Sequence, residues 1–292
     1  MNIGRIGIWA FLDMLPQAKA QEAAAEIEEM GFGAIWLPEA VGREVMTSST
    51  LLLSKTKKIT IATGIANMWA RDAVTMSAAH KTISEAFPGR FLLGIGASHK
   101  HLVENLRGHE YTKPFSAMSE YLDKMDAAPF FAAAPSEPPA RVLAALGPKM
   151  LKLAAEKALG AHPYFVSVEH TKFARETMGD GPLLAPEQAV VLETDPTKAR
   201  ELARKHMAIY LRAPNYTNNL KRMGFTDDDL ADGGSDRLAD AIVAWGDERV
   251  IVERVKAHLD AGADHVCIQV INDGGEAPMA EYRELAPALL AL

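Results

Sequence analysis

The sequence predicts an α/β protein built as one closed (β/α)8 barrel, and three observations favour this fold. Segments typical of buried strands alternate with segments typical of helices, which indicates a parallel sheet. Eight such strand–helix units can be counted along the chain. The length of 292 residues suits a single barrel domain spanning residues 1–292. An open doubly wound sheet is the alternative, but the Gly94-x-Gly96 pair lacks the third glycine of a dinucleotide-binding loop, since His99 holds that place.

The first half of the chain contains five predicted units. Runs of β-branched and apolar residues favour a pleated, half-buried surface and mark the strands. Pro16 suits the first turn of a helix, and Gly31 suits the position just past its end. Asp72 begins the third helix, which Pro88-Gly89 ends. The predicted strands are 5–11, 34–37, 59–63, 91–95 and 141–145, and the predicted helices are 16–30, 45–54, 72–87, a short polar one after 99, 114–127 and one that begins at 147–148.

The second half contains three further units and one interruption. Residues 213–245, between the seventh and eighth strands, carry several asparagines, an acidic run at 227–229 and a pair of glycines at 233–234. We interpret this segment as an inserted excursion with short helices that serves as a lid or a dimer contact. The predicted strands are 163–167, 189–192 and 265–270, and the predicted helices are 169–178, 195–211, 247–261 and 278–292.

Composition narrows the possible partners and the compartment. The net charge of −7 argues against a broad surface for nucleic acid or for an anionic membrane. Cys267 is the single cysteine, so no intrachain disulfide can form, which fits a reducing cytoplasm. No apolar run approaches the ~20 residues that a transmembrane helix needs, and the N-terminus shows no signal-peptide pattern. We expect a cytoplasmic protein that acts on a small molecule.

Residues 59–99 form the most informative unit, a strand, a loop, a helix and a second strand. Two strands joined through a helix should be parallel neighbours, and functional groups in such units lie beyond their carboxyl ends. That rule points to residues 64–71 and 96–101. Gly64-Ile65 ends the first strand and indicates either a bulge that lets a ligand approach the backbone or an ordinary turn.

Polar residues after three strands are candidates for chemistry. Glu39 directly follows the second strand, where it is either a site carboxylate or a solvated loop residue. His99 follows the fourth strand and can exchange protons near neutral pH, or it is a plain surface histidine. His101 and Glu104 lie close by in sequence, but no third or fourth metal ligand is evident, so we expect no metal. Gly147-Pro148-Lys149 opens a helix whose free N–H groups favour an anion, although a tight turn with an exposed lysine has the same pattern.

Trp9, Trp36 and Trp69 lie at or near predicted strand ends. They either line an aromatic pocket or pack in the core. The sequence shows no nucleophile elbow, Walker loop or zinc motif, so hydrolase and NTPase functions have no support.

These motifs together resemble the bacterial luciferase-like monooxygenase superfamily, and most closely its branch of oxidoreductases that use the deazaflavin coenzyme F-420. The resemblance covers nearly the whole chain. The residues that carry it are 5–9, 33–39, 62–99, 143–150 and 260–269, of which 63–72 and 89–96 are the most specific.

The resemblance implies a (β/α)8 barrel with a flavin or deazaflavin ring at its C-terminal mouth. It implies a bulge with a non-prolyl cis peptide behind the ring at Gly64-Ile65 and an acidic contact from Glu39. It also implies backbone N–H groups that bind the phosphate in the turn after the fifth strand, which Gly147-Pro148 matches. We expect His99 to act as the general acid or base, and Glu39 to tune or orient the groups of the site. The implied cofactor contacts are Glu39, Gly64, Ile65, Ala66, Ala97, Ser98, Gly147, Pro148, Lys149, Phe165, Val166 and Ser167, and the implied substrate contacts are Trp9, Phe11 and Trp69.

The chain departs from the related sugar-phosphate dehydrogenases. His99 stands where those enzymes have a glutamate, no asparagine appears where another cofactor contact is expected, and Val168-Glu169 follow the predicted sixth strand where a basic residue is expected. These departures argue against a sugar-phosphate substrate.

The activity that the resemblance implies is hydride transfer between coenzyme F-420 (8-hydroxy-5-deazaflavin) and a small organic substrate, in a homodimer. The alternatives are an FMN-dependent monooxygenase that uses O2 and a non-catalytic flavin-binding protein.

Overall fold

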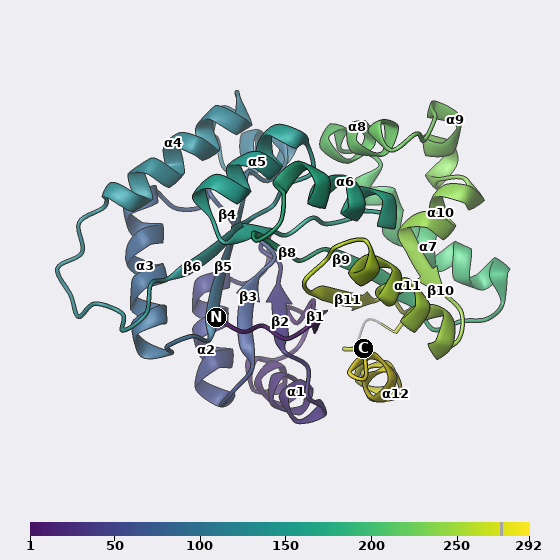
Figure 1. Cartoon of the computed structure of the whole chain (residues 1–292), viewed down its shortest axis with the longest axis horizontal. Coiled ribbons are helices and arrows are strands. Elements are labelled where there is room, and N and C mark those ends of the chain that lie inside the picture. Colours follow the sequence, from purple (N-terminus) through teal and green to yellow (C-terminus); the bar gives the residue numbers. More distant parts are fainter. Residues whose placement is uncertain (275–276) are drawn as a thin grey trace.

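Eleven strands form one sheet at the centre of the molecule in a computed structural model that describes residues 1–274 and 277–292 (Figure 1). Every paired strand in it is parallel to its neighbour. The strands are β1 (Ile6–Trp9), β2 (Ala34–Leu37), β3 (Thr60–Thr63), β4 (Ala66–Asn67), β5 (Phe91–Gly96), β6 (Ala140–Leu143), β7 (Gly160–Ala161), β8 (Leu183–Leu184), β9 (Glu187–Val191), β10 (Val243–Trp245) and β11 (Val266–Val270).

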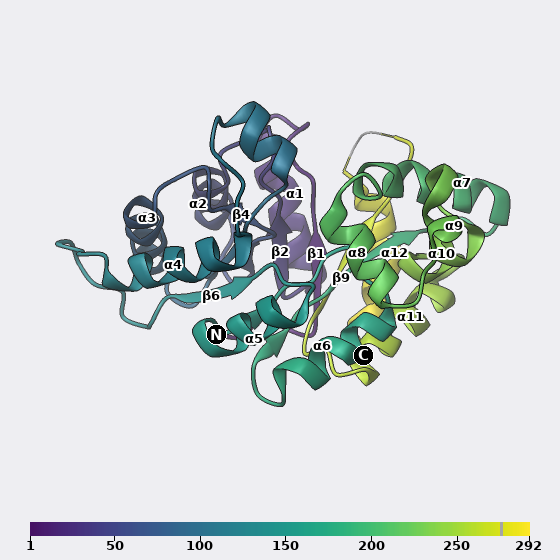
Figure 2. The same cartoon turned by 90° about the horizontal axis from the view of Figure 1, so that it is seen from above.

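Helices follow the strands and cover the outside of the sheet (Figures 1 and 2). They are α1 (Gln17–Met30), α2 (Val45–Lys55), α3 (Ala73–Ala86), η1 (Leu102–Leu106), α4 (Pro114–Ala127), α5 (Pro148–Lys157), α6 (Val168–Met178), α7 (Pro196–Tyr210), α8 (Pro214–Arg222), α9 (Asp227–Leu230), η2 (Ala231–Gly233), α10 (Asp236–Ile242), α11 (Glu248–Asp260) and α12 (Met279–Leu289). No helix in the described part of the chain is long and apolar enough to cross a membrane.

The sheet closes on itself, which confirms the (β/α)8 barrel. The strand order is β10-β9-β11-β1-β2-β3-β5-β6-β7-β8, and β8 at one end of this order is followed directly in the chain by β9, which lies next to the other end. Between β8 and β9, the Ala185 N–H donates to the Ala161 carbonyl at 2.9 Å, and the Pro186 carbonyl accepts from the Cys267 N–H at 3.1 Å. Residues 183–191 therefore act as one bent strand that bonds to neighbours on both sides.

Local sequence signals account for the helix ends in the first half. The Asp72 side chain accepts from the N–H groups of Val74 and Thr75 and so caps α3. Gly31 adopts a left-handed φ of 101° after α1, a conformation that costs glycine little.

The predicted strand at 163–167 is wrong. The sixth barrel strand is the short β7 at Gly160–Ala161, and the segment after it is irregular. Phe165 has a φ of 60°, which no strand tolerates. The aromatic and branched side chains of the segment pack in a loop, whereas Gly160 and Ala161 carry no apolar run that signals a strand. The short strands β8 and β10 were not predicted either, and the short helix after His99 is a π-helix, η1.

Residues 213–245 contain α8, α9, η2 and α10 and end with β10, which pairs with β9. Figure 2 shows α7 to α10 grouped on one side of the molecule. They enclose a hydrophobic core separate from the main one, in which Phe165 of the β7–α6 loop meets Tyr216, Leu220 and Phe225. This second core seats α8 beside the barrel mouth.

Candidate functional site

A cavity of about 480 Å³ opens where the carboxyl ends of the barrel strands meet. Its wall combines residues at or after six strands, namely β1, β2, β3, β5, β6 and β7, with residues from α7 and α8. The residues that line it are Trp9, Pro38, Glu39, Ala40, Gly64, Ile65, Gly96, Ala97, Ser98, His99, Leu102, Tyr111, Pro114, Ala144, Ala145, Leu146, Gly147, Met150, His162, Tyr164, Tyr210, Asn215, Tyr216, Asn218 and Arg222. A cavity of this size, lined mostly by apolar groups with a few polar ones, is typical of a small-molecule or cofactor site.

The structure brings together about half of the residues predicted for the site. Trp9, Glu39, Gly64, Ile65, Ala97, Ser98, His99 and Gly147 line the cavity. The other predicted residues lie outside its wall, and they are Phe11, Ala66, Trp69, Pro148, Lys149, Phe165, Val166 and Ser167.

Packing explains these displacements. Ala66 is fully buried because it pairs with Ile95 in the sheet. The Trp69 indole N–H donates to the Ala97 carbonyl at 3.0 Å, which holds that ring behind the wall. Phe11 is 54% exposed, and Lys149 lies on the exposed first turn of α5. Phe165 is buried because it packs into the second core, and Val166 and Ser167 next to it are buried as well.

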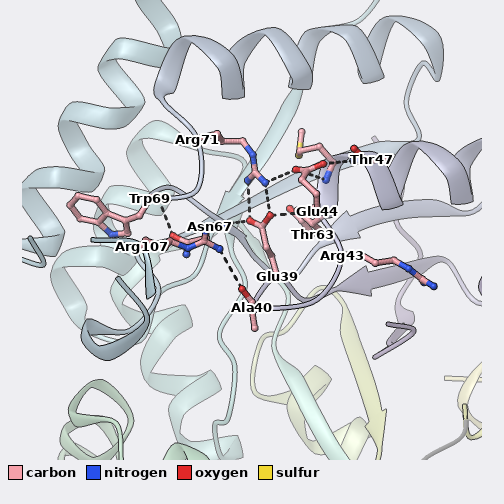
Figure 3. A network of polar contacts seen from close by, with 12 residues as sticks. Glu39, Ala40, Arg43, Glu44, Thr47, Thr63, Asn67, Trp69, Arg71 and Arg107 are labelled. Atoms are coloured by element: carbon pink, nitrogen blue, oxygen red, sulfur yellow. Dashed lines mark hydrogen bonds and ion pairs between the residues drawn. The ribbon is translucent and has the colours of Figure 1, made fainter. Parts of the chain in front are cut away.

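Glu39 is held in a buried network of polar contacts (Figure 3). The Arg71 guanidinium grips its carboxylate with two hydrogen bonds, one of them 3.0 Å long, and also reaches Glu44. The Asn67 N–H donates to the same carboxylate at 2.7 Å. The Glu39 and Arg71 side chains are only 5% and 9% exposed. Because its charge is already paired, Glu39 fixes the loop after β3 and does not offer a free base.

His99 lies half-buried on the cavity wall, after β5. Its ring centroid lies 5.5 Å from that of Tyr216 and 6.1 Å from that of His101. Burial lowers the pKa of His99, so the ring is neutral at pH 7. A neutral imidazole that faces a cavity can accept or relay a proton.

The wall behind the middle of the cavity is built around Gly64. The Gly64-Ile65 peptide is cis, as the resemblance implied. A Cβ on Gly64 would lie 2.9 Å from the Trp9 indole nitrogen and 3.0 Å from Nε2 of His162, so only glycine fits. The His162 ring stacks on Trp36 with centroids 4.2 Å apart and donates from Nδ1 to the Ala185 carbonyl at 2.7 Å. Burial lowers the pKa of His162 to about 4.

Gly147 stands at one end of the cavity, immediately before α5. It is the N-cap of that helix, and no side chain among residues 1–274 and 277–292 caps the first N–H groups. These groups and the positive end of the helix dipole favour an anion.

Several cavity residues were missed by sequence reasoning. Tyr164 precedes α6 and Tyr210 ends α7, whereas Asn215, Tyr216, Asn218 and Arg222 come from α8. One signal was available for the last group, because Asn215, Asn218 and Arg222 recur at a spacing that places them on one helix face.

The tyrosines of this wall differ in their hydrogen bonds. The Tyr164 hydroxyl donates to Oε1 of Gln269 at 2.8 Å and accepts from the Tyr210 hydroxyl at 2.7 Å. Tyr216 is 8% exposed, and its hydroxyl has no hydrogen-bond partner within residues 1–274 and 277–292. Within the same residues, no three side chains of the types His, Cys, Asp and Glu gather in a group that could hold a metal.

The fold and the cavity define a barrel enzyme with a small-molecule site at its C-terminal mouth. The chain belongs to the luciferase-like monooxygenase family, whose model matches residues 12–265. This result confirms the resemblance at the level of the family.

Individual relatives are more distant. A 5,10-methylenetetrahydromethanopterin reductase of Archaeoglobus fulgidus is 28% identical over 251 residues, which cover 74% of each chain. A protein of Mycobacterium tuberculosis, provisionally named a coenzyme F-420-dependent oxidoreductase, is 28% identical over 124 residues, or 42% of this chain; the match spans only 35% of that relative's length.

A solved structure of similar fold is an F-420-dependent secondary alcohol dehydrogenase in complex with an F-420–acetone adduct. It superimposes with a TM-score of 0.78 at 17% identity and covers 98% of this chain and 99% of that chain. At this identity the similarity shows the fold alone.

Proposed function

We propose that the protein is an oxidoreductase that uses the deazaflavin coenzyme F-420 to exchange a hydride with a small organic substrate. The observation that carries the proposal is the cavity itself. It is bordered by Gly64-Ile65 at the end of β3 and by Gly147 at the start of α5, the two positions that the resemblance assigns to the ring and to the phosphate. The names of two relatives, an F-420-dependent oxidoreductase and a methanopterin reductase, agree with this chemistry.

The wall fits a flat ring system. A Cβ on Gly96 would lie 2.5 Å from Ile65, so the backbone of β5 and the Ile65 side chain form a close, apolar surface. Gly64, Ile65 and Ala97 would back the ring, and the free N–H groups after Gly147 would hold a phosphate. When bound, the coenzyme supplies a carbon that accepts or gives a hydride.

The side chains of this chain would supply binding and proton transfer. Ser98 and His99 border the cavity on the side of β5, and the neutral His99 is our choice for the group that takes up or returns the substrate proton. Glu39 acts at a distance by holding Arg71 and the loop of residues 66–71 in place. Trp9 and Tyr164, whose ring centroids lie 5.1 Å apart, narrow the inner part of the cavity and exclude water.

The alternative is an FMN-dependent monooxygenase, which the family description also covers. A titration separates the two. Coenzyme F-420 and oxidised FMN are each added to the protein while its tryptophan fluorescence is followed, because Trp9 lines the cavity and should be quenched. We expect tighter binding of F-420. Tight binding of FMN without binding of F-420 would overturn the proposal.

A second experiment tests catalysis and the third possibility, a non-catalytic flavin-binding protein. A panel of alcohols, aldehydes, ketones and enones is screened for a change in the visible absorbance of bound F-420. No change with any substrate would favour the non-catalytic role. For a substrate that reacts, His99→Ala should lower kcat at least tenfold, and an unchanged kcat would remove His99 from the reaction.

We further propose that residues 1–292 act as one domain and that the protein is a cytoplasmic homodimer. Light scattering during size-exclusion chromatography tests the dimer, and a monomer mass would contradict it.

A further inference from the structure

Arg222 is the one unneutralised charge among the residues described on the cavity wall. Only two residues of that wall carry a formal charge at pH 7, namely Glu39 and Arg222, since burial lowers the pKa values of His99 and His162. Arg71 neutralises Glu39 from behind the wall. No acidic side chain within residues 1–274 and 277–292 forms an ion pair with Arg222. In a chain with a net charge of −7, an unpaired cation facing a cavity indicates an anionic ligand.

A residue of the same helix, α8, orients the guanidinium of Arg222. Arg222 is the last residue of α8, and its Nη1 donates to Oδ1 of Asn219 at 2.8 Å. Asn219 is only 1% exposed, so it is a rigid anchor. The other guanidinium nitrogen, Nη2, lies 3.7 Å from the point where a Cβ on Gly147 would stand. Arg222 therefore extends over the start of α5, with Asn218 on the same face of α8 and on the same cavity wall.

The neighbouring lysine provides a contrast. Lys221 is paired with Asp227 at 2.5 Å and is absent from the cavity wall. Of the two adjacent cations that end α8, one is neutralised on the surface and the other is left unpaired at the cavity.

We propose that Arg222, supported by Asn218, binds a phosphate or carboxylate group of the ligand that fills this cavity. Arginine suits the task because its planar fork matches the oxygens of either group. The proposal rests on the proposed function for the ligand's identity. Residues 162–169, which follow β7, include no lysine or arginine, so the cation on the cavity wall comes from α8 instead. The anion belongs either to the coenzyme or to the substrate.

The test compares F-420 with its phosphate-free deazaflavin riboside by fluorescence titration. If the anion is on the coenzyme, Arg222→Gln weakens F-420 binding by about tenfold or more, the size of one charge-assisted hydrogen bond, and leaves riboside binding unchanged. Arg222→Lys should recover part of the loss, and raised salt should reduce the difference. Lys221→Gln is the matched control and should change neither affinity.

Inorganic phosphate distinguishes the second source. If the anion is on the substrate, Arg222→Gln leaves F-420 affinity unchanged, and phosphate raises the thermal midpoint of the F-420-loaded wild type but not that of the loaded variant. The proposal is overturned if the variant loses riboside and F-420 affinity equally, or if it changes neither F-420 affinity nor the response to phosphate.

Failure of the proposed function has a different signature. In that case the wild type binds neither F-420 nor its riboside, while phosphate still stabilises the wild type and not Arg222→Gln.

Discussion

Glu39 and Arg222 are the two charged side chains on the cavity wall, and they lie in opposite environments. The Glu39 side chain is 5% exposed, and its carboxylate oxygens are already bound by Arg71 and by the Asn67 N–H. Arg222 is exposed, donates to the buried Asn219 and makes no other hydrogen bond within residues 1–274 and 277–292, so most of its donors are free. The difference separates two roles, because a neutralised charge shapes the wall whereas a free charge is available to a ligand.

The same contrast holds for the elements that carry them. The Glu39 side is made of the neighbouring loops that follow β2 and β3, which the contacts of Arg71 with Glu39 and Glu44 hold together (Figure 3). The Arg222 side is made of α7 and α8, which rest on their own hydrophobic core. We expect substitutions on the Glu39 side to affect stability and substitutions on the Arg222 side to affect ligand binding.

The largest expected effect is loss of stability in acid, and it sets the pH range in which the two sides can be compared. Besides His99, burial holds the pKa of six histidines well below the ordinary 6.5, so only the unfolded chain takes up their protons as the pH first falls below that value. They are His80, His162, His170, His206, His258 and His265. Each such histidine costs about 1.4 kcal/mol of stability per pH unit between 6.5 and its folded pKa.

Glu187 acts in the opposite direction. Burial raises its pKa to about 8, so the folded carboxyl keeps a proton that the unfolded one loses above pH 4.5. One carboxyl does not offset six histidines. The midpoint of thermal unfolding should therefore fall steeply between pH 7 and pH 5, and an unchanged midpoint would contradict this account.

Removing the cation on the Glu39 side should have the next largest effect. Arg71→Gln leaves the buried carboxylate of Glu39 without its partner, so we expect a loss of about 3–5 kcal/mol in the free energy of unfolding. Urea unfolding at pH 7 measures it. Arg222→Gln is the control and should change stability by no more than about 0.5 kcal/mol. Equal losses of unfolding free energy in the two variants would contradict the distinction between a structural role for the Glu39 side and a ligand-binding role for the Arg222 side.

Neutralising the acid should cost less. Glu39→Gln keeps an oxygen for the Asn67 N–H, and Arg71 retains Glu44 as a partner. We expect a loss of about 1–3 kcal/mol in the same measurement. A loss larger than that of Arg71→Gln would mean that the carboxylate has a partner besides Arg71 that matters more.

The smallest expected effects concern two tyrosines on the Arg222 side of the cavity, one on α7 and one on α8. Tyr210→Phe removes the hydrogen bond to the Tyr164 hydroxyl and should cost about 1 kcal/mol. Tyr216→Phe removes a hydroxyl without a protein partner and should change stability by less than about 0.5 kcal/mol. The reverse order of the two losses would show that the Tyr216 hydroxyl is bonded in the folded protein.

Sequence patterns predicted most of the barrel because the signals are local. The apolar run at 34–37, the β-branched run at 60–63, the Asp72 cap and the Gly31 stop each act within a few residues, and the structure has these elements where they were expected. The prediction was wrong at 163–167, where the apolar side chains that suggested a strand belong to an irregular loop and Phe165 packs in the second hydrophobic core. The strands β7 and β8 were not predicted either. Each is only two residues long, so it has too few residues for a sequence pattern and is defined by its pairing with neighbouring strands.

For the site, sequence by itself determined the end of the barrel that carries the cavity and the residues that directly follow the first five strands, because a parallel sheet brings those positions together. Glu39, Gly64, His99 and Gly147 are all found on the wall. Only the tertiary structure decided that Glu39 is neutralised by Arg71, which is 32 residues away. It alone decided that Arg222 of α8 faces Gly147 of the β6–α5 turn. Such pairings depend on how helices and loops distant in sequence pack against one another, and no local pattern encodes that packing.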